Sequence, residues 1–150
     1  MKHGLIFDLD GTLVDSLRGI SSSVNHALRV SGLPTHPIEA VRGFIGNGAR
    51  LLIERAASPA TGEELYLTLE GAFKTHYDVS WPDGTVPYEE IVEMLEALQA
   101  EGYPLAVLSN KPHAFTVTIV EKLFPSVTFA CVLGQRVGIA HKPDPAGALE

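Results

Sequence analysis

The chain has 150 residues, of which 45% are hydrophobic, and a formal net charge of −7. This length suits one domain of ordinary size or a core that carries an insertion, and the hydrophobic content excludes a disordered chain. The acidic balance, without any basic run, argues against nonspecific nucleic-acid binding. No apolar stretch approaches the roughly 20 residues of a membrane span. A small phosphorylated partner remains possible because it needs only a local positive site.

Cys131 is the only cysteine, so no intramolecular disulfide can form. We therefore expect a reducing, cytoplasmic location, and the early Asp8 leaves no room for a signal peptide. Because Cys131 lies in the apolar run Thr-Phe-Ala-Cys-Val-Leu, we expect a buried thiol and not a nucleophile.

The first half of the chain predicts one strand followed by helices. Residues 3–8 (HGLIFD) indicate a short buried strand. Helices are expected from Asp15 or Ser16 to about residue 30, over about 37–44, from about 49 to a stop at Ser58-Pro59, and over about 62–78. The spacing of three and four between apolar residues supports the first helix (Leu17, Ile20, Val24, Leu28) and the last (Leu65, Leu69, Phe73, Tyr77).

The pattern changes after the stretch Trp81-Pro82-Asp83-Gly84. A helix over about 88–101, with Ile91, Met94, Leu95 and Leu98 inward, leads to a strand at 104–109. A helix at about 112–124, a strand at 128–133 and a short helix after Pro145 follow. Alternating strands and helices predict a parallel sheet with right-handed crossovers. The expected fold class is α/β, a Rossmann-like core from residues 1–14 and 81–150 with a helical insertion at 15–80.

Chemically useful residues follow each predicted strand. The first strand ends at Asp8, with Asp10 two residues on, and the second ends at Ser109, followed by Asn110 and Lys111. The loop after the third strand carries Lys142 in HKPDP. Ligands of parallel α/β sheets bind at the carboxyl ends of the strands, so these side chains are expected at one edge.

Two neighbouring carboxylates repel each other unless a cation lies between them, and Mg²⁺ is typically held by one or two carboxylates, waters and substrate phosphate. A nearby lysine and hydroxyl would bind phosphoryl oxygens. One carboxylate can attack phosphorus directly, while the other protonates the leaving alkoxide and later activates water. The combination therefore predicts phosphoryl transfer.

The segments FDLDGTLVD, LSNK at 108–111 and HKPDP at 141–145 resemble the first three signatures of the haloacid dehalogenase superfamily, in its phosphatase branch. The helical insertion matches the cap of that family. FIGNGARLLIERA at 44–56 resembles the cap segment of its phosphoglycolate phosphatases. The resemblance covers nearly the whole chain and implies a Mg²⁺-dependent phosphomonoesterase that acts through an aspartyl-phosphate, with 2-phosphoglycolate as the expected substrate.

The resemblance also implies roles for single residues. Asp8 would be the nucleophile and a Mg²⁺ ligand, and Asp10 the acid/base with its carbonyl on the metal. Ser109 would bind the transferring phosphoryl group, and Lys142 would neutralise the nucleophile and the phosphate. Substrate-binding roles are implied for Gly11, Thr12, Asn110, Asn47 and Gly48.

The fourth signature of the family, an acidic strand end, would lie beyond Glu150. We therefore expect the core to be incomplete at its C-terminus, and the 150-residue species to bind Mg²⁺ poorly. Two alternatives stay open: a sugar-phosphate phosphatase or phosphomutase of the same superfamily, and a noncatalytic truncated module. A dehalogenase is disfavoured because Asp10 gives that chemistry no advantage.

Several of these residues also have a purely structural interpretation. Asp10-Gly11-Thr12 by itself is also a common turn. Lys111 and His113 are interpreted as the start of a helix and not as catalysts. Asn47 suits a left-handed turn as well as a substrate-facing loop. Arg50 and Arg55 are interpreted as a solvated helix face.

Overall fold

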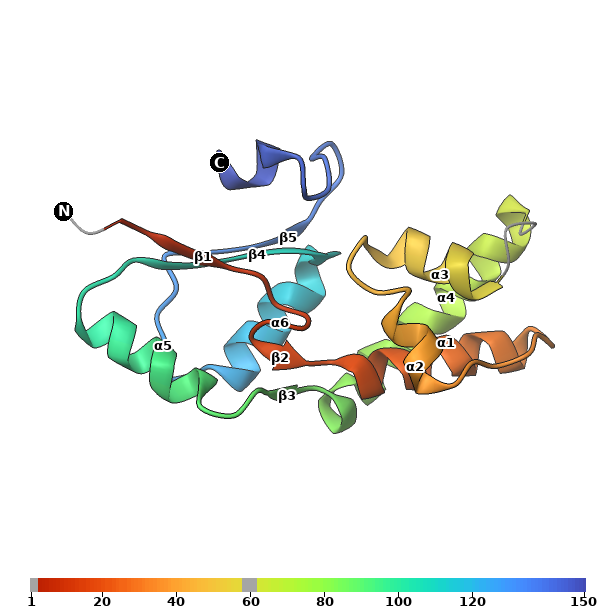
Figure 1. Cartoon of the computed structure of the whole chain (residues 1–150). Helices are drawn as coiled ribbons and strands as arrows, with labels where there is room; N and C mark the ends of the chain where they lie inside the picture. Colours follow the sequence, from red (N-terminus) through yellow and green to blue (C-terminus); the bar gives the residue numbers. More distant parts are fainter. Residues whose placement is uncertain (1–2, 58–61) are drawn as a thin grey trace. The chain divides into compact units, whose positions relative to one another are not determined.

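The computed structural model describes residues 3–57 and 62–150. The chain divides into two compact units: an α/β unit, residues 1–15 with 86–150, and a helical unit, residues 16–85. These boundaries lie next to those expected from the sequence, at 14 and 80. Figure 1 shows the helical unit as one excursion of the chain between two parts of the α/β unit.

The α/β unit is built on a three-stranded parallel sheet in the order β1-β4-β5. Its strands are β1 (Leu5–Phe7), β4 (Leu105–Pro112) and β5 (Cys131–Gln135). Leu5 pairs with Leu105, and Val107 of β4 pairs with Val132 of β5. The sheet confirms the predicted α/β fold class, because neighbouring parallel strands need crossover connections, which are usually helical.

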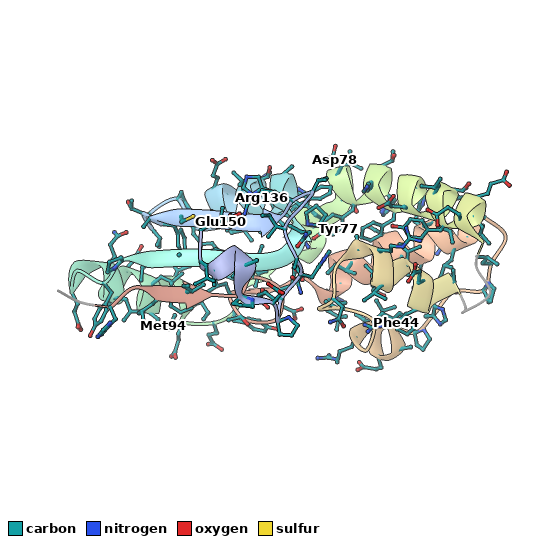
Figure 2. The ribbon with its side chains drawn as sticks, turned by 90° about the horizontal axis from the view of Figure 1, so that it is seen from above. Phe44, Tyr77, Asp78, Met94, Arg136 and Glu150 are labelled. Carbon is teal, nitrogen blue, oxygen red and sulfur yellow. The ribbon has the colours of Figure 1, made fainter. Side chains whose placement is uncertain are left out.

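Two helices complete the crossovers, α5 (Ile91–Ala100) and α6 (His113–Leu123). Figure 1 shows both on one side of the sheet and the segment after β5 on the other. That segment ends in the 3₁₀ helix η2 (Pro145–Ala148), at the place where a short helix after Pro145 was predicted. Arg136 at its start is paired with Glu150 at its end (Figure 2).

Three predictions of burial are wrong. Ile6 in β1 is 56% exposed and Cys131 at the start of β5 is exposed, although both were expected in the core. Both residues lie on outer strands of the described sheet, and only β4 has a strand on each side. Met94 is 38% exposed because α5 buries a narrow stripe centred on Leu95.

A second, two-stranded antiparallel sheet lies where the chain leaves and re-enters the α/β unit. Its strands are β2 (Val14–Asp15) and β3 (Val86–Pro87). Tyr88 adds a backbone hydrogen bond of 3.2 Å to the carbonyl of Leu13. Both ends of the helical insertion are thus anchored at one place in the α/β unit. The sequence did not predict these strands, which are too short to show periodicity.

The helical unit contains α1 (Leu17–Val30), α2 (Ile38–Arg42), α3 (Ala49–Ala57), α4 (Glu63–Ser80) and the 3₁₀ helix η1 (Trp81–Gly84). The order of helices is as predicted, and the predicted stop at Ser58-Pro59 lies outside the described residues. The long helices α1 and α4 pack together through a shared apolar stripe: Ile20, Val24, Leu28, Leu69, Phe73 and Tyr77.

η1 belongs to the helical unit because it packs on α1 at a pair of glycines. A Cβ atom at Gly84 would lie 2.6 Å from the Cα of Gly19, so no larger residue fits there. Within the two described ranges, no helix is both long and apolar enough to cross a bilayer.

Candidate active site

The loop after β1 is folded around the carbonyl of Leu9. This oxygen accepts the N–H groups of Thr12, Leu13 and Val14 at 3.2, 3.0 and 3.1 Å. Gly11 has φ +77°, a conformation that favours glycine, and donates its N–H to Val14. Leu9 and Leu13 are fully buried. The tight turn therefore fixes the backbone on either side of Asp10.

Asp8 forms an ion pair with Lys142. Lys142 Nζ lies 2.8 Å from Asp8 Oδ1 and also donates to the carbonyl of Leu108 at 2.7 Å. The backbone N–H of Leu9 donates to the same Asp8 oxygen at 2.7 Å. The Asp8 side chain is 43% exposed, which leaves this carboxylate accessible to a ligand from solvent.

Asp10 forms an ion pair with a different lysine, Lys111. Lys111 Nζ lies 3.1 Å from both Oδ1 and Oδ2 of Asp10. The two side chains are only 14% and 7% exposed, so this is the more buried of the two pairs. The two carboxylates are thus each neutralised separately, which relieves the repulsion expected for aspartates one residue apart.

Ser109 and Asn110 connect the end of β4 to these lysines. Ser109 Oγ accepts the backbone N–H of Lys111 at 3.1 Å. Asn110 Oδ1 accepts the backbone N–H of Lys142 at 2.8 Å, and its Nδ2 donates to the Lys142 carbonyl at 3.2 Å. Both side chains belong to buried residues. Asn110 therefore fixes the backbone that presents Lys142 to Asp8.

The structure thus brings Asp8, Asp10, Ser109 and Lys142 to one end of the sheet, where the sequence placed them. Gly11 and Thr12 lie exposed in the same loop. β4 runs three residues past its predicted end, with a shift of register between Leu108 and Pro112. This extension carries Lys111 into the site.

Sequence reasoning expected Lys111 at this edge of the sheet but interpreted it as the start of a helix, and so did not assign it to the site. One signal was available in the sequence. Ser109 and Lys111 are two residues apart, and in a strand this spacing puts both side chains on one face. An extended β4 would therefore have predicted Lys111 beside Ser109.

Asn47 and Gly48 lie in the helical unit, in the loop between α2 and α3. Gly46 and Gly48 both have positive φ, at +108° and +87°, and Asn47 between them is exposed. Arg55 of α3 donates to the carbonyl of Phe44 at 3.0 Å, which ties the start of this loop to the helix. Arg50 is engaged with Glu54 and Glu63 at 2.8 Å each.

The residues present suit a hard divalent cation. Among the described residues, no group of three or more His, Cys, Asp and Glu side chains is clustered for metal binding. Mg²⁺ needs only one or two carboxylates beside water and phosphate. Asp8 fits this requirement, since both of its contacts recorded in the described part of the chain use Oδ1.

Comparison with known proteins decides the family. The family model described as "Haloacid dehalogenase-like hydrolase" matches residues 5–150. The chain belongs to this family. The matched range includes the two aspartates, the serine and the lysine at the end of the sheet.

The curated relatives are named phosphoglycolate phosphatase. The chain is similar to that of Psychrobacter arcticus, with 36% identity over 99% of this chain and 67% of the relative. It is similar to that of Escherichia coli strain K12, with 35% identity over 95% of this chain and 65% of the relative. The chain therefore spans about two thirds of the length of these relatives.

A solved structure shows the same fold. The crystal structure of a predicted phosphoglycolate phosphatase from Haemophilus somnus 129pt matches with a TM-score of 0.90 and 34% identity. The match covers 99% of this chain and 70% of that chain. Both the α/β core and the helical insertion are thus included in the shared fold.

Proposed function

We propose that the protein is a Mg²⁺-dependent phosphomonoester hydrolase that acts through an aspartyl-phosphate on Asp8, with 2-phosphoglycolate as substrate. One observation carries the chemical part of this proposal. Asp8 and Asp10 are each paired with a different lysine; the Asp8 carboxylate is exposed, whereas the Asp10 carboxylate is largely buried. The relatives named phosphoglycolate phosphatase support the choice of substrate.

In the first step a carboxylate oxygen of Asp8 attacks the phosphorus atom. The bond between phosphorus and the ester oxygen breaks, and Asp10 gives its proton to the leaving alkoxide. In the second step Asp10 takes a proton from water, whose oxygen attacks phosphorus. The bond to Asp8 breaks, inorganic phosphate leaves, and Asp10 is again protonated for the next cycle.

We assign the other residues of the site to neutralising the charge of the phosphoryl group and to positioning its partners. Lys142 lies against the attacking carboxylate, where its ammonium would also attract the phosphoryl oxygens. Ser109 would donate its hydroxyl to the same oxygens, and Gly11 and Thr12, which are exposed in the loop after β1, would lie beside the bound substrate. Asn110 would act by holding Lys142. Mg²⁺, held by the carboxylate of Asp8 and the backbone carbonyl of Asp10, would neutralise the negative charge of the bound phosphate.

We propose further that residues 15–80 act as the cap domain of this family, with Asn47 and Gly48 contributing to substrate binding. The loop that carries them is held by Arg55 and is exposed at Asn47, which suits contact with a ligand. A cytoplasmic location is part of the proposal and is supported by the single cysteine. Nucleic acid and membrane are not proposed as partners.

The test is a hydrolysis assay on the natural protein with Mg²⁺ and a panel of small phosphomonoesters. We expect 2-phosphoglycolate to give the highest kcat/KM, with phosphate released to water. Asp8→Asn should eliminate turnover while circular dichroism and the thermal midpoint stay close to wild type. Transfer of the phosphoryl group to a sugar phosphate in place of water would identify a phosphomutase, and wild-type rates in Asp8→Asn would reject Asp8 as nucleophile.

A further inference from the structure

Lys111 lies at the junction of three contacts that lead to different parts of the site. Its ammonium is 3.1 Å from both oxygens of Asp10, and its N–H donates to Ser109 Oγ at 3.1 Å. Its carbonyl accepts the hydroxyl of Thr116, on α6, at 3.2 Å. One residue therefore links the proposed acid/base, the proposed phosphoryl-binding serine and the helix behind them.

The main chain at Lys111 is also held from the neighbouring strand. A Cβ atom at Gly134 of β5 would lie only 2.6 Å from the Lys111 carbonyl, so β5 packs directly against it. Thr116 is fully buried and donates to the carbonyls of both Lys111 and Pro112. The position of Lys111 is thus set by β5 and α6, independently of its charged end.

A buried ammonium is costly unless it is paired, and an apolar residue at a structural position avoids that cost. The Lys111 side chain is 7% exposed and spans from the end of β4 to the loop after β1. The symmetric contact with both Asp10 oxygens fixes the plane of the carboxylate as well as its charge. This geometry suits a carboxylate that must keep one orientation.

We propose that Lys111 is the positioning residue of Asp10: it orients the carboxylate that exchanges the proton with the leaving group and with water. The inference rests on the proposed function. It assigns separate tasks to the two lysines, Lys142 for the nucleophile and Lys111 for the acid/base. Without Lys111, Asp10 keeps its chemistry but loses its fixed orientation.

The experiment compares Lys111→Met with wild type on two substrates, an alkyl phosphate that needs protonation of its leaving group and nitrophenyl phosphate that needs little. Misplacement of a catalytic group by about 1 Å can lower a rate by about 10²-fold. We expect a kcat loss of this order for the alkyl phosphate, a several-fold smaller loss for nitrophenyl phosphate, and a nearly unchanged KM. Lys111→Arg should recover part of the loss.

The same substitution is then made in Asp10→Asn. If Lys111 acts through Asp10, Lys111→Met should add little further loss in that background. Lys74→Met is the matched control, since Lys74 lies in the helical unit, is 49% exposed and pairs with Glu70 at 3.0 Å. Its rates on both substrates should equal those of wild type.

Thr116→Val provides a milder variant, because it removes only the hydroxyl contacts to the Lys111 and Pro112 carbonyls. It should show the same preference for nitrophenyl phosphate, with a smaller loss. Equal losses on both substrates in every folded variant, or full additivity with Asp10→Asn, would overturn the proposal. Wild-type protein without any phosphomonoesterase activity would overturn the proposed function and this inference together, whereas active wild type with an unchanged Lys111→Met overturns the inference alone.

Discussion

The two units of the molecule differ in how far they expose their charged pairs to solvent. In the α/β unit, the Lys111–Asp10 pair is 7% and 14% exposed and lies at the end of the sheet. In the helical unit, Arg50 lies between Glu54 and Glu63, with exposed fractions of 56%, 38% and 62%. An exposed pair contributes about 0–1 kcal/mol, whereas a buried charge needs its partner to avoid a large desolvation cost. Removal of one partner should therefore affect the buried Lys111–Asp10 pair more than the exposed pairs of Arg50.

The helical unit instead contains part-buried hydrogen bonds between polar side chains and backbone groups. Asn25 holds the backbone of His36 from both sides, with two hydrogen bonds of 2.8 Å. The hydroxyls of Ser23 and Ser80 lie 2.9 and 3.1 Å from Nδ1 of His76. These contacts connect α1 to the segment before α2 and to α4. They explain how the helices are held together, without providing a charged site.

Among the substitutions that test this comparison, the largest effect is expected at Asp10. Asp10→Asn should slow hydrolysis by about 10²–10⁴-fold, the usual loss when a general acid/base is removed. The loss should shrink for substrates with good leaving groups, because these need little protonation. Steady-state kcat values on alkyl and nitrophenyl phosphates check this, and equal losses on both would contradict the acid/base role.

A polar contact of the helical unit should affect stability and not chemistry. Asn25→Ala removes both hydrogen bonds to His36 and leaves its backbone groups partly unsatisfied. We expect a loss of about 1–3 kcal/mol in the free energy of unfolding. Urea denaturation followed by far-UV circular dichroism measures it. A stability equal to wild type would show that water replaces the amide at this position.

His76 should make the stability of the helical unit depend on pH. Burial, the nearby His26 and Arg29 lower the pKa of His76 below its ordinary value of 6.5. The unfolded chain then binds more protons than the folded one just below that pH, so stability is complete above about 6.5 and falls as the pH is lowered through the folded-state pKa. The midpoint of thermal unfolding, measured from pH 8 to pH 5, should decline less in His76→Gln; identical declines would contradict the assignment.

The smallest effect is expected at Arg50. Its guanidinium bonds to Glu63 and Glu54 and lies 4.3 Å from the ring centre of Tyr66, and these bonds to Arg50 lower the pKa of Glu63. Because the pairs are exposed and screened by solvent, Arg50→Met should leave the midpoint of chemical denaturation close to that of wild type. Chemical denaturation checks this. A loss as large as that of Asn25→Ala would remove the distinction drawn between exposed charge pairs and part-buried polar contacts.

The sequence predicted the order of strands and helices because apolar periodicity is a local property. Which strands lie at the edge of the sheet depends on pairing between distant segments, so the exposure of Ile6 and Cys131 was not predicted. β4 exceeds its predicted end because its register with β5 shifts after Leu108. The two-residue strands β2 and β3 have no pattern of their own.

The candidate site was predicted through residues that follow strands, and this reasoning placed Asp8, Asp10, Ser109 and Lys142 at one edge. The pairing of each aspartate with its own lysine was not predictable from spacing, since Lys111 and Lys142 reach the site from different segments. Asn110 was expected near the substrate, and the structure places its amide on the backbone of Lys142. The roles assigned to these residues stay predictions.

The most direct test of the account is the identification of the phosphorylated residue. The natural protein is mixed with Mg²⁺ and a phosphomonoester, quenched in acid within one turnover, digested and examined by mass spectrometry. The account predicts an acid-stable, base-labile phosphoryl group on Asp8, absent from Asp8→Asn and longer-lived in Asp10→Asn, where water is activated slowly. A phosphoryl group on another residue, or rapid turnover with no phosphoenzyme in wild type or Asp10→Asn, would contradict the assignment of the exposed aspartate as nucleophile.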